Sequence, residues 1–95
     1  MSLYKIILVD DEEEVRDSIK RKVDWNLLGF EVIGSVNNGE EAMELTEINH
    51  VDVVLTDIKM PFMDGLTLCA KVKENYKNTK VVLYFLRCKY RFYHC

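Results

Sequence analysis

The sequence predicts an α/β fold, a doubly wound parallel sheet with helices on both faces. Two observations support this prediction. Four short apolar segments recur along the chain, and three amphipathic segments with helical spacing separate them. Strands that alternate with single helices pair in parallel through right-handed connections. Because the chain has only 95 residues, we expect one folded domain with one site.

The first two predicted strands flank the first predicted helix. The segment from Leu3 to Val9 is almost continuously apolar, as in a strand buried on both faces of a parallel sheet, and the segment from Phe30 to Val36 is the second predicted strand. Between them, apolar residues recur at four-residue spacing and predict an amphipathic helix: Val15, Ile19 and Val23. Three glutamates in its first turn suit the positive end of the helix dipole: Glu12, Glu13 and Glu14.

The middle of the chain predicts a second helix and a third strand. The segment from Glu40 to Ile48 has apolar residues on one helical face, and Asn38 is its expected N-cap. The third apolar run extends from Val51 to Thr56. It ends directly before Asp57.

A loop, a third helix and a fourth strand follow. Pro61 restricts its own backbone and that of its predecessor, which predicts a loop after Asp57. Asp64 is the expected cap of the third helix. The segment from Lys80 to Leu86 is the fourth apolar run, so the predicted order is βαβαβαβ.

Carboxylates end two of the predicted strands. Asp10 and Asp11 follow the first strand and Asp57 follows the third, and these strands are neighbours in the flavodoxin-like order 2-1-3-4. Each acid alone is also typical of a helix start or a strand end. Together they predict a site at the carboxyl edge of the sheet, where ligands bind in such folds. With no basic residue expected among them, a divalent cation such as Mg²⁺ would relieve their repulsion, and an aspartate beside it can attack phosphorus.

Three motifs stand at the ends of the predicted strands and at the start of the second predicted helix: Leu8-Val9-Asp10-Asp11-Glu12, Asn38-Gly39-Glu40-Glu41-Ala42 and Asp57-Ile58-Lys59-Met60-Pro61-Phe62-Met63-Asp64-Gly65. In this order and spacing they closely resemble the signature of response-regulator receiver domains of bacterial two-component systems. The resemblance spans about residues 4–84. Trp25 followed by Leu28-Gly29-Phe30-Glu31-Val32 has a weaker likeness to receivers with AraC-type DNA-binding output domains.

The resemblance implies a role for each site residue. Asp57 would be the phosphoacceptor, Asp11 and Asp57 direct Mg²⁺ ligands, Asp10 a ligand through water, and the backbone carbonyl of Lys59 a further ligand. A histidine kinase would donate the phosphoryl group, and nucleic acid would be bound only through an output domain absent from this chain. We therefore expect a cytoplasmic signalling phosphoprotein that regulates transcription, not an enzyme, with no membrane segment.

The end of the chain departs from the family pattern. Receivers place a small hydroxyl residue at the end of the fourth strand and a lysine at the end of a fifth, but Phe85 stands at the first position and a fifth strand is apparently missing. All sixteen acidic residues lie at or before Glu74, and residues 84–95 carry half of the aromatic side chains. We expect an incomplete receiver at residues 1–84 and an atypical tail without regular period at residues 85–95. The uncovered edge of the fourth strand predicts a homo-oligomer.

Two other functions remain open. A pseudo-receiver that serves only for dimerisation is favoured by the missing hydroxyl and lysine. An aspartate-nucleophile Mg²⁺ phosphohydrolase would need an acid two residues beyond its nucleophile, where Lys59 stands. The three cysteines form no CxxC pair and are interpreted as free thiols: Cys69, Cys88 and Cys95.

Overall fold

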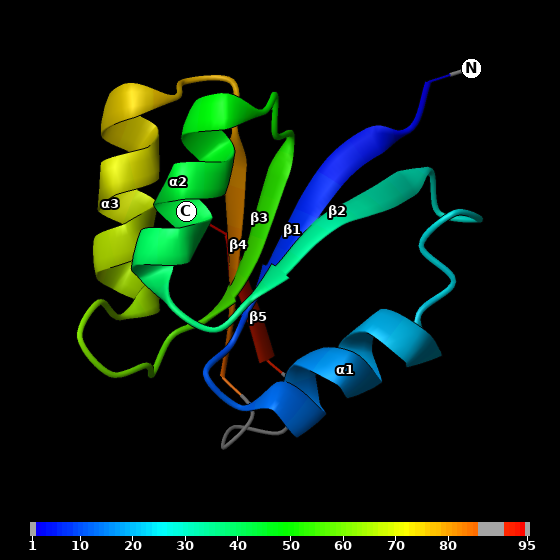
Figure 1. Ribbon diagram of the computed structural model, residues 1–95, viewed down its shortest axis with the longest axis horizontal. Coiled ribbons are helices and arrows are strands. Elements are labelled where there is room, and N and C mark those ends of the chain that lie inside the picture. The colour runs from blue at the N-terminus through cyan, green and yellow to red at the C-terminus, as the bar shows by residue number, and fades with distance from the viewer. Residues whose placement is uncertain (1, 86–90, 95) are drawn as a thin grey trace.

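A computed structural model gives one sheet with three helices (Figure 1). It describes residues 2–85 and, for the backbone alone, residues 91–94. Helices α2 and α3 lie together over one face of the sheet, and α1 lies apart from them. The elements are β1 (Tyr4–Val9), α1 (Glu13–Lys22), β2 (Phe30–Val36), α2 (Gly39–Ile48), β3 (Val53–Asp57), α3 (Gly65–Asn75), β4 (Lys80–Phe85) and β5 (Arg91–His94).

The strand order is β2-β1-β3-β4-β5. Strand β1 pairs in parallel with β2 and with β3, and β3 pairs in parallel with β4. The predicted parallel order 2-1-3-4 of a flavodoxin-like sheet is therefore confirmed. Because β1 and β3 are direct neighbours, with Val9 opposite Thr56, the residues that follow both strands meet at one edge of the sheet.

The fourth strand is not an uncovered edge. Strand β5 pairs with it in antiparallel fashion, with Leu83 opposite Tyr93. The expectations of a missing fifth strand and of a tail without strand structure are therefore wrong for residues 91–94. Pairing with an open edge uses backbone groups and needs no alternating pattern in the added segment, so periodicity did not reveal it. The uncovered edge therefore no longer supports the predicted homo-oligomer, which stays a prediction. The predicted domain boundary after residue 84 also stays a prediction.

Side-chain alternation along the strands builds two apolar cores. Ile7 and Val9 face α2 and α3, whereas Ile6 and Leu8 face α1. Full burial of each such aliphatic side chain contributes about 1.5–3 kcal/mol. On the α1 side the core also contains Leu55 and Tyr84, with Val15 and Ile19 packed against it.

The predicted helix caps are confirmed. Asn38 Oδ1 accepts a hydrogen bond of 2.8 Å from the Glu41 N–H, and Asp64 Oδ1 accepts one of 2.8 Å from the Thr67 N–H. Each cap satisfies one of the backbone donors that a helix start leaves open. The Asp64 cap also fixes where the loop after Asp57 ends.

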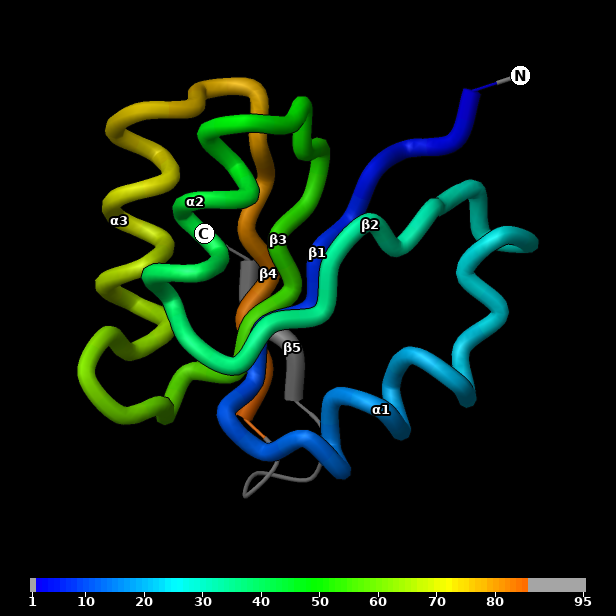
Figure 2. The backbone as a smooth tube through the Cα atoms, viewed as in Figure 1, coloured from blue at the N-terminus to red at the C-terminus, as the bar shows by residue number. Residues whose placement is uncertain are grey.

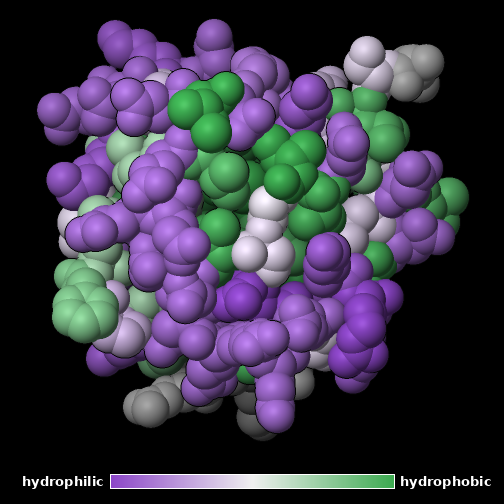
Figure 3. Space-filling view, viewed as in Figure 1, coloured by the Kyte–Doolittle hydropathy of each residue, from purple (hydrophilic) through white to green (hydrophobic). Residues whose placement is uncertain are grey.

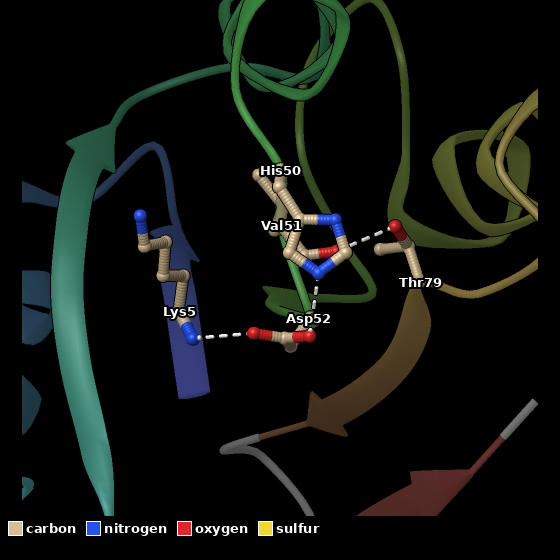
Figure 4. A network of polar contacts seen from close by, with 5 residues as sticks. All are labelled: Lys5, His50, Val51, Asp52 and Thr79. Carbon is tan, nitrogen blue, oxygen red and sulfur yellow. Dashed lines mark hydrogen bonds and ion pairs between the residues drawn. The ribbon is translucent and has the colours of Figure 1, made fainter. Parts of the chain in front are cut away.

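Polar contacts hold the opposite ends of the strands in register (Figure 4). Asp52 Oδ2 accepts from the Lys5 N–H at 2.7 Å, which lowers the pKa of Asp52, and Asp52 Oδ1 lies 2.9 Å from His50 Nε2. Thr79 Oγ1 donates to the Val51 carbonyl at 2.6 Å. These contacts join β1, β3 and β4 before the strands begin to run in parallel, and so align their carboxyl ends.

The face seen in Figure 1 is only partly covered by helices. Figure 3 shows apolar side chains gathered in the middle of this face, beside α2 and over β1 and β2. In agreement, six of the seven residues of β2 are half-buried. Within residues 2–85, no helix is long and apolar enough to cross a membrane.

The state of one cysteine thiol differs from the one we expected from the sequence. Cys69 in α3 is disulfide-bonded, so its assignment as a free thiol is wrong. Cys88 and Cys95 lie outside the described residues. Sequence spacing did not indicate this bond, because a disulfide depends on distance in the fold rather than on spacing in the chain.

Gly65 allows a close approach between α3 and the end of β3. A Cβ atom there would lie 2.3 Å from the Asp57 carbonyl oxygen and 2.9 Å from the Ile58 Cα. Both are backbone atoms and cannot rotate away. We expect Gly65→Ala to lower the free energy of unfolding by about 1–3 kcal/mol, as overpacking does, in urea denaturation.

A neighbouring position supplies the control for this prediction. Leu66 is exposed on the first turn of the same helix. Leu66→Ala is therefore expected to change the free energy of unfolding by less than about 0.5 kcal/mol. Equal stability of the Gly65→Ala variant and the parent would show that this backbone contact is not tight.

Candidate acidic site

Three carboxylates meet at the carboxyl edge of the sheet. The chain leaves β1 and β3 at the same edge, as Figure 2 shows. Asp10 and Asp11 follow β1 directly, and Asp57 is the last residue of β3. One carboxylate oxygen from each of the three lies within 4.8 Å of the others. The structure thus brings together the three acids that the sequence singled out.

Strand alternation determines how these acids are buried. Asp10 continues the side of β1 on which Ile6 and Leu8 lie, and Asp57 continues the side of β3 on which Leu55 lies, so both belong to the α1 side of the sheet. Asp10 is only 1% exposed, Asp57 is half-buried and Asp11 is exposed. The exposure of the three acids therefore increases from Asp10 through Asp57 to Asp11, and the site is open to solvent at Asp11.

Asp10 is held by contacts on both of its carboxylate oxygens. Oδ1 accepts a hydrogen bond of 2.8 Å from the Glu12 N–H, and Oδ2 accepts one from the Tyr84 hydroxyl. Burial raises the pKa of Asp10, and these two hydrogen bonds oppose the rise. Burial and the bond to Asp10 raise the pKa of Tyr84, so the hydroxyl remains a donor.

A protein cation does lie near the acids, contrary to our expectation. Arg16 Nη1 donates to the main-chain carbonyl of Asp10, and its Nε donates to Ser35 Oγ at 2.8 Å. The guanidinium also acts to lower the pKa of Asp10. Arg16 lies in α1, six residues after Asp10, and the helix brings it back to the end of β1. Its charge offsets only part of the charge of three carboxylates.

The pKa of the Asp57 carboxyl is strongly raised. Burial, followed by the charge of Asp10, raises the pKa of Asp57 to about 6. The Lys59 N–H donates to Asp57 Oδ1 at 3.3 Å, which favours the charged form. Near neutral pH the site therefore holds closely spaced negative charge that an oxygen-seeking cation would stabilise.

Lys59 lies in the loop that follows β3, as the sequence predicted, and its side chain is exposed. Its backbone N–H contacts Asp57, whereas a ligand role for its carbonyl stays a prediction. Sequence reasoning missed Tyr84, because it looked for a hydroxyl one residue later, at Phe85. The parallel pairing of β3 and β4 places Tyr84, not Phe85, opposite Asp57.

The raised pKa of Asp57 predicts a pH-dependent loss of stability in the cation-free protein. The unfolded chain releases this proton near the ordinary value of 3.8, whereas the folded chain keeps it until about 6. The protonated carboxyl therefore favours folding below 3.8, and this contribution is lost as the pH rises through about 6. In Asp57→Asn, the contribution of this carboxyl to the pH dependence of stability is absent.

The measurement is urea denaturation in the presence of a chelator, from about pH 4 to pH 7. We expect the stability of the parent relative to Asp57→Asn to fall across this range and then level. Asp17→Asn, an exposed position in α1, is the matched control and should track the parent. A constant difference between parent and Asp57→Asn would contradict the raised pKa.

Comparisons with known proteins agree with this geometry. Residues 6–86 match the model of the response regulator receiver domain family. The chain is 44% identical over 70 residues to the uncharacterized transcriptional regulatory protein YesN of Bacillus subtilis, covering 74% of this chain and 19% of that protein. The chain thus spans about a fifth of the length of this curated relative.

Two solved structures are also similar. The REC domain of AraT, a response regulator from Geobacillus stearothermophilus, has a TM-score of 0.79 and 38% identity over 85% of this chain and 63% of that chain. A two component transcriptional regulator AraC from Clostridium phytofermentans has a TM-score of 0.78 and 31% identity over 84% of this chain and 64% of that chain.

Proposed function

Because this chain belongs to the family of response regulator receiver domains, we propose that it is a phosphorylation-dependent signalling domain in which Asp57 accepts the phosphoryl group. A histidine kinase is the phosphodonor. In the whole protein, the output is an AraC-type DNA-binding domain that regulates transcription, and the likeness to the AraC regulator supports this part. The chain itself turns over no substrate in this proposal.

The convergence of the three carboxylates carries the proposal. Asp57 is half-buried at a strand end, and oxygens of Asp10 and Asp11 lie within 4.8 Å of it. Strand capping would explain each acid alone but does not require two strands to end in acids at the same edge. A cluster of carboxylates in which one member, here Asp57, has a raised pKa is typical of a functional site.

In the proposed reaction, Asp57 acts as the nucleophile. One carboxylate oxygen forms a bond to phosphorus while the bond between phosphorus and the donor imidazole nitrogen breaks, and the electron pair of that bond stays on the imidazole, which is then protonated. The product is an acyl phosphate on Asp57. The Lys59 N–H donates to Asp57 Oδ1 and helps to orient this carboxylate for the attack.

The donor set of the site fits Mg²⁺. Its side-chain donors are oxygens, and Mg²⁺ is commonly held by one or two carboxylates together with water and phosphate oxygens. Asp11 and Asp57 would bind it directly, Asp10 would bind through water, and the Lys59 carbonyl would be a further ligand. When bound, this ion supplies charge neutralisation at the transferring phosphoryl oxygens.

Treatment with a small phosphodonor such as acetyl phosphate and Mg²⁺ tests the proposal. Intact mass should show one phosphoryl group that persists on the chain. Continuous release of phosphate without a phosphorylated species would favour the phosphohydrolase, which is opposed by Lys59 two residues beyond Asp57. An unmodified chain would favour the pseudo-receiver, which is supported by Phe85 at the expected hydroxyl position.

A further inference from the structure

Tyr84 contacts the acidic site from inside the protein. Its side chain is 2% exposed and lies in the α1-side core with Ile6, Leu8 and Leu55. The pairing of β3 with β4 places Tyr84 opposite Asp57, and its hydroxyl donates to Asp10 Oδ2. The ring thus fills apolar space while its polar end reaches the carboxylates.

This contact leaves Asp10 little freedom to move. The Glu12 N–H holds the other carboxylate oxygen at 2.8 Å, and Arg16 holds the main-chain carbonyl of the same residue. A carboxylate with a protein donor on each oxygen cannot turn both oxygens toward one cation without breaking one of these bonds. Asp10 is therefore held in a pose that suits contact through water.

We propose that the Tyr84 hydroxyl is a positioning group that prevents bidentate or additional direct coordination by Asp10, and so makes the acidic site favour Mg²⁺ over Ca²⁺. The inference rests on the proposed cation site at Asp10, Asp11 and Asp57. Mg²⁺ requires six ligands in near-ideal octahedral geometry and uses few carboxylates. Ca²⁺ accepts six to eight oxygens and readily takes bidentate carboxylates, so it gains more from an extra oxygen.

Tyr84→Phe tests this role, because it keeps the ring and removes only the hydroxyl. Calorimetric titration gives the dissociation constants of Mg²⁺ and Ca²⁺ for parent and variant. We expect the preference for Mg²⁺ over Ca²⁺ to fall about fivefold, the scale set by the loss of one hydrogen bond. Tyr84→Leu, which also lacks the hydroxyl, replaces it if the first variant does not fold.

Two further variants separate positioning from general damage. Tyr76→Phe removes a hydroxyl from a half-buried tyrosine at the end of α3 and should leave both constants unchanged. The double variant Tyr84→Phe/Asp10→Asn should have the same preference for Mg²⁺ over Ca²⁺ as the single variant Asp10→Asn, because Tyr84 acts through the Asp10 carboxylate.

The outcomes distinguish this inference from the proposed function. An unchanged cation preference in Tyr84→Phe, or equal weakening of both cations, overturns the positioning role while Mg²⁺ binding by the parent still supports the site. A preference change that persists in the double variant also overturns it. Absence of any Mg²⁺ binding by the parent overturns both.

Discussion

The substitutions Asp11→Asn and Asp57→Asn are expected to weaken Mg²⁺ binding at least about tenfold each, since even the loss of an outer-shell partner costs metal sites about that much. Each removes one charge from the three-carboxylate cluster and replaces one anionic oxygen with a weaker neutral donor. Arg16 is unaffected by either change and continues to offset part of the remaining charge.

Binding is measured by calorimetric titration at neutral pH, with Asp17→Asn as the control. This exposed aspartate in α1 carries the same charge as the site residues, so its loss changes the net charge of the chain equally. The affinity of the Asp17→Asn variant for Mg²⁺ should equal that of the parent. Parent-like affinity in both Asp11→Asn and Asp57→Asn would show that the ion binds elsewhere.

Most of the fold could be predicted from local patterns. The segment from Phe30 to Val36, predicted as the second strand, coincides with β2, and Asn38 and Asp64 cap the helices they were expected to cap. These features depend on residues close together in the sequence. The convergence of Asp10, Asp11 and Asp57 also followed, because the alternation of strands and helices indicates a doubly wound sheet, and the flavodoxin-like order makes the first and third strands neighbours.

The remaining features depend on contacts between distant segments. Tyr84 reaches Asp10 across 74 positions of the chain, and no local pattern in an apolar strand distinguishes a ring that ends at a carboxylate from one that ends in the core. Strand β5 pairs through its backbone with the edge of β4, which side-chain periodicity does not record. Arg16 looked like an ordinary charged position of an amphipathic helix.

Asp57→Ala is expected to abolish stable phosphorylation by a small phosphodonor. The acyl phosphate requires the carboxylate oxygen, and alanine offers no nucleophile at this position. Loss of a group that forms the covalent intermediate typically lowers the rate by several orders of magnitude, about 10⁴-fold or more. Asp17→Asn should be modified to the same extent as the parent, because its side chain is exposed on α1.

The most direct measurement of the central claim locates the phosphoryl group within the chain. The parent protein is treated with acetyl phosphate and Mg²⁺, and peptide mass spectrometry identifies the modified residue. We predict a single modification on Asp57, at the end of β3. Modification of a serine or of another carboxylate, with Asp57 unmodified, would contradict the proposal.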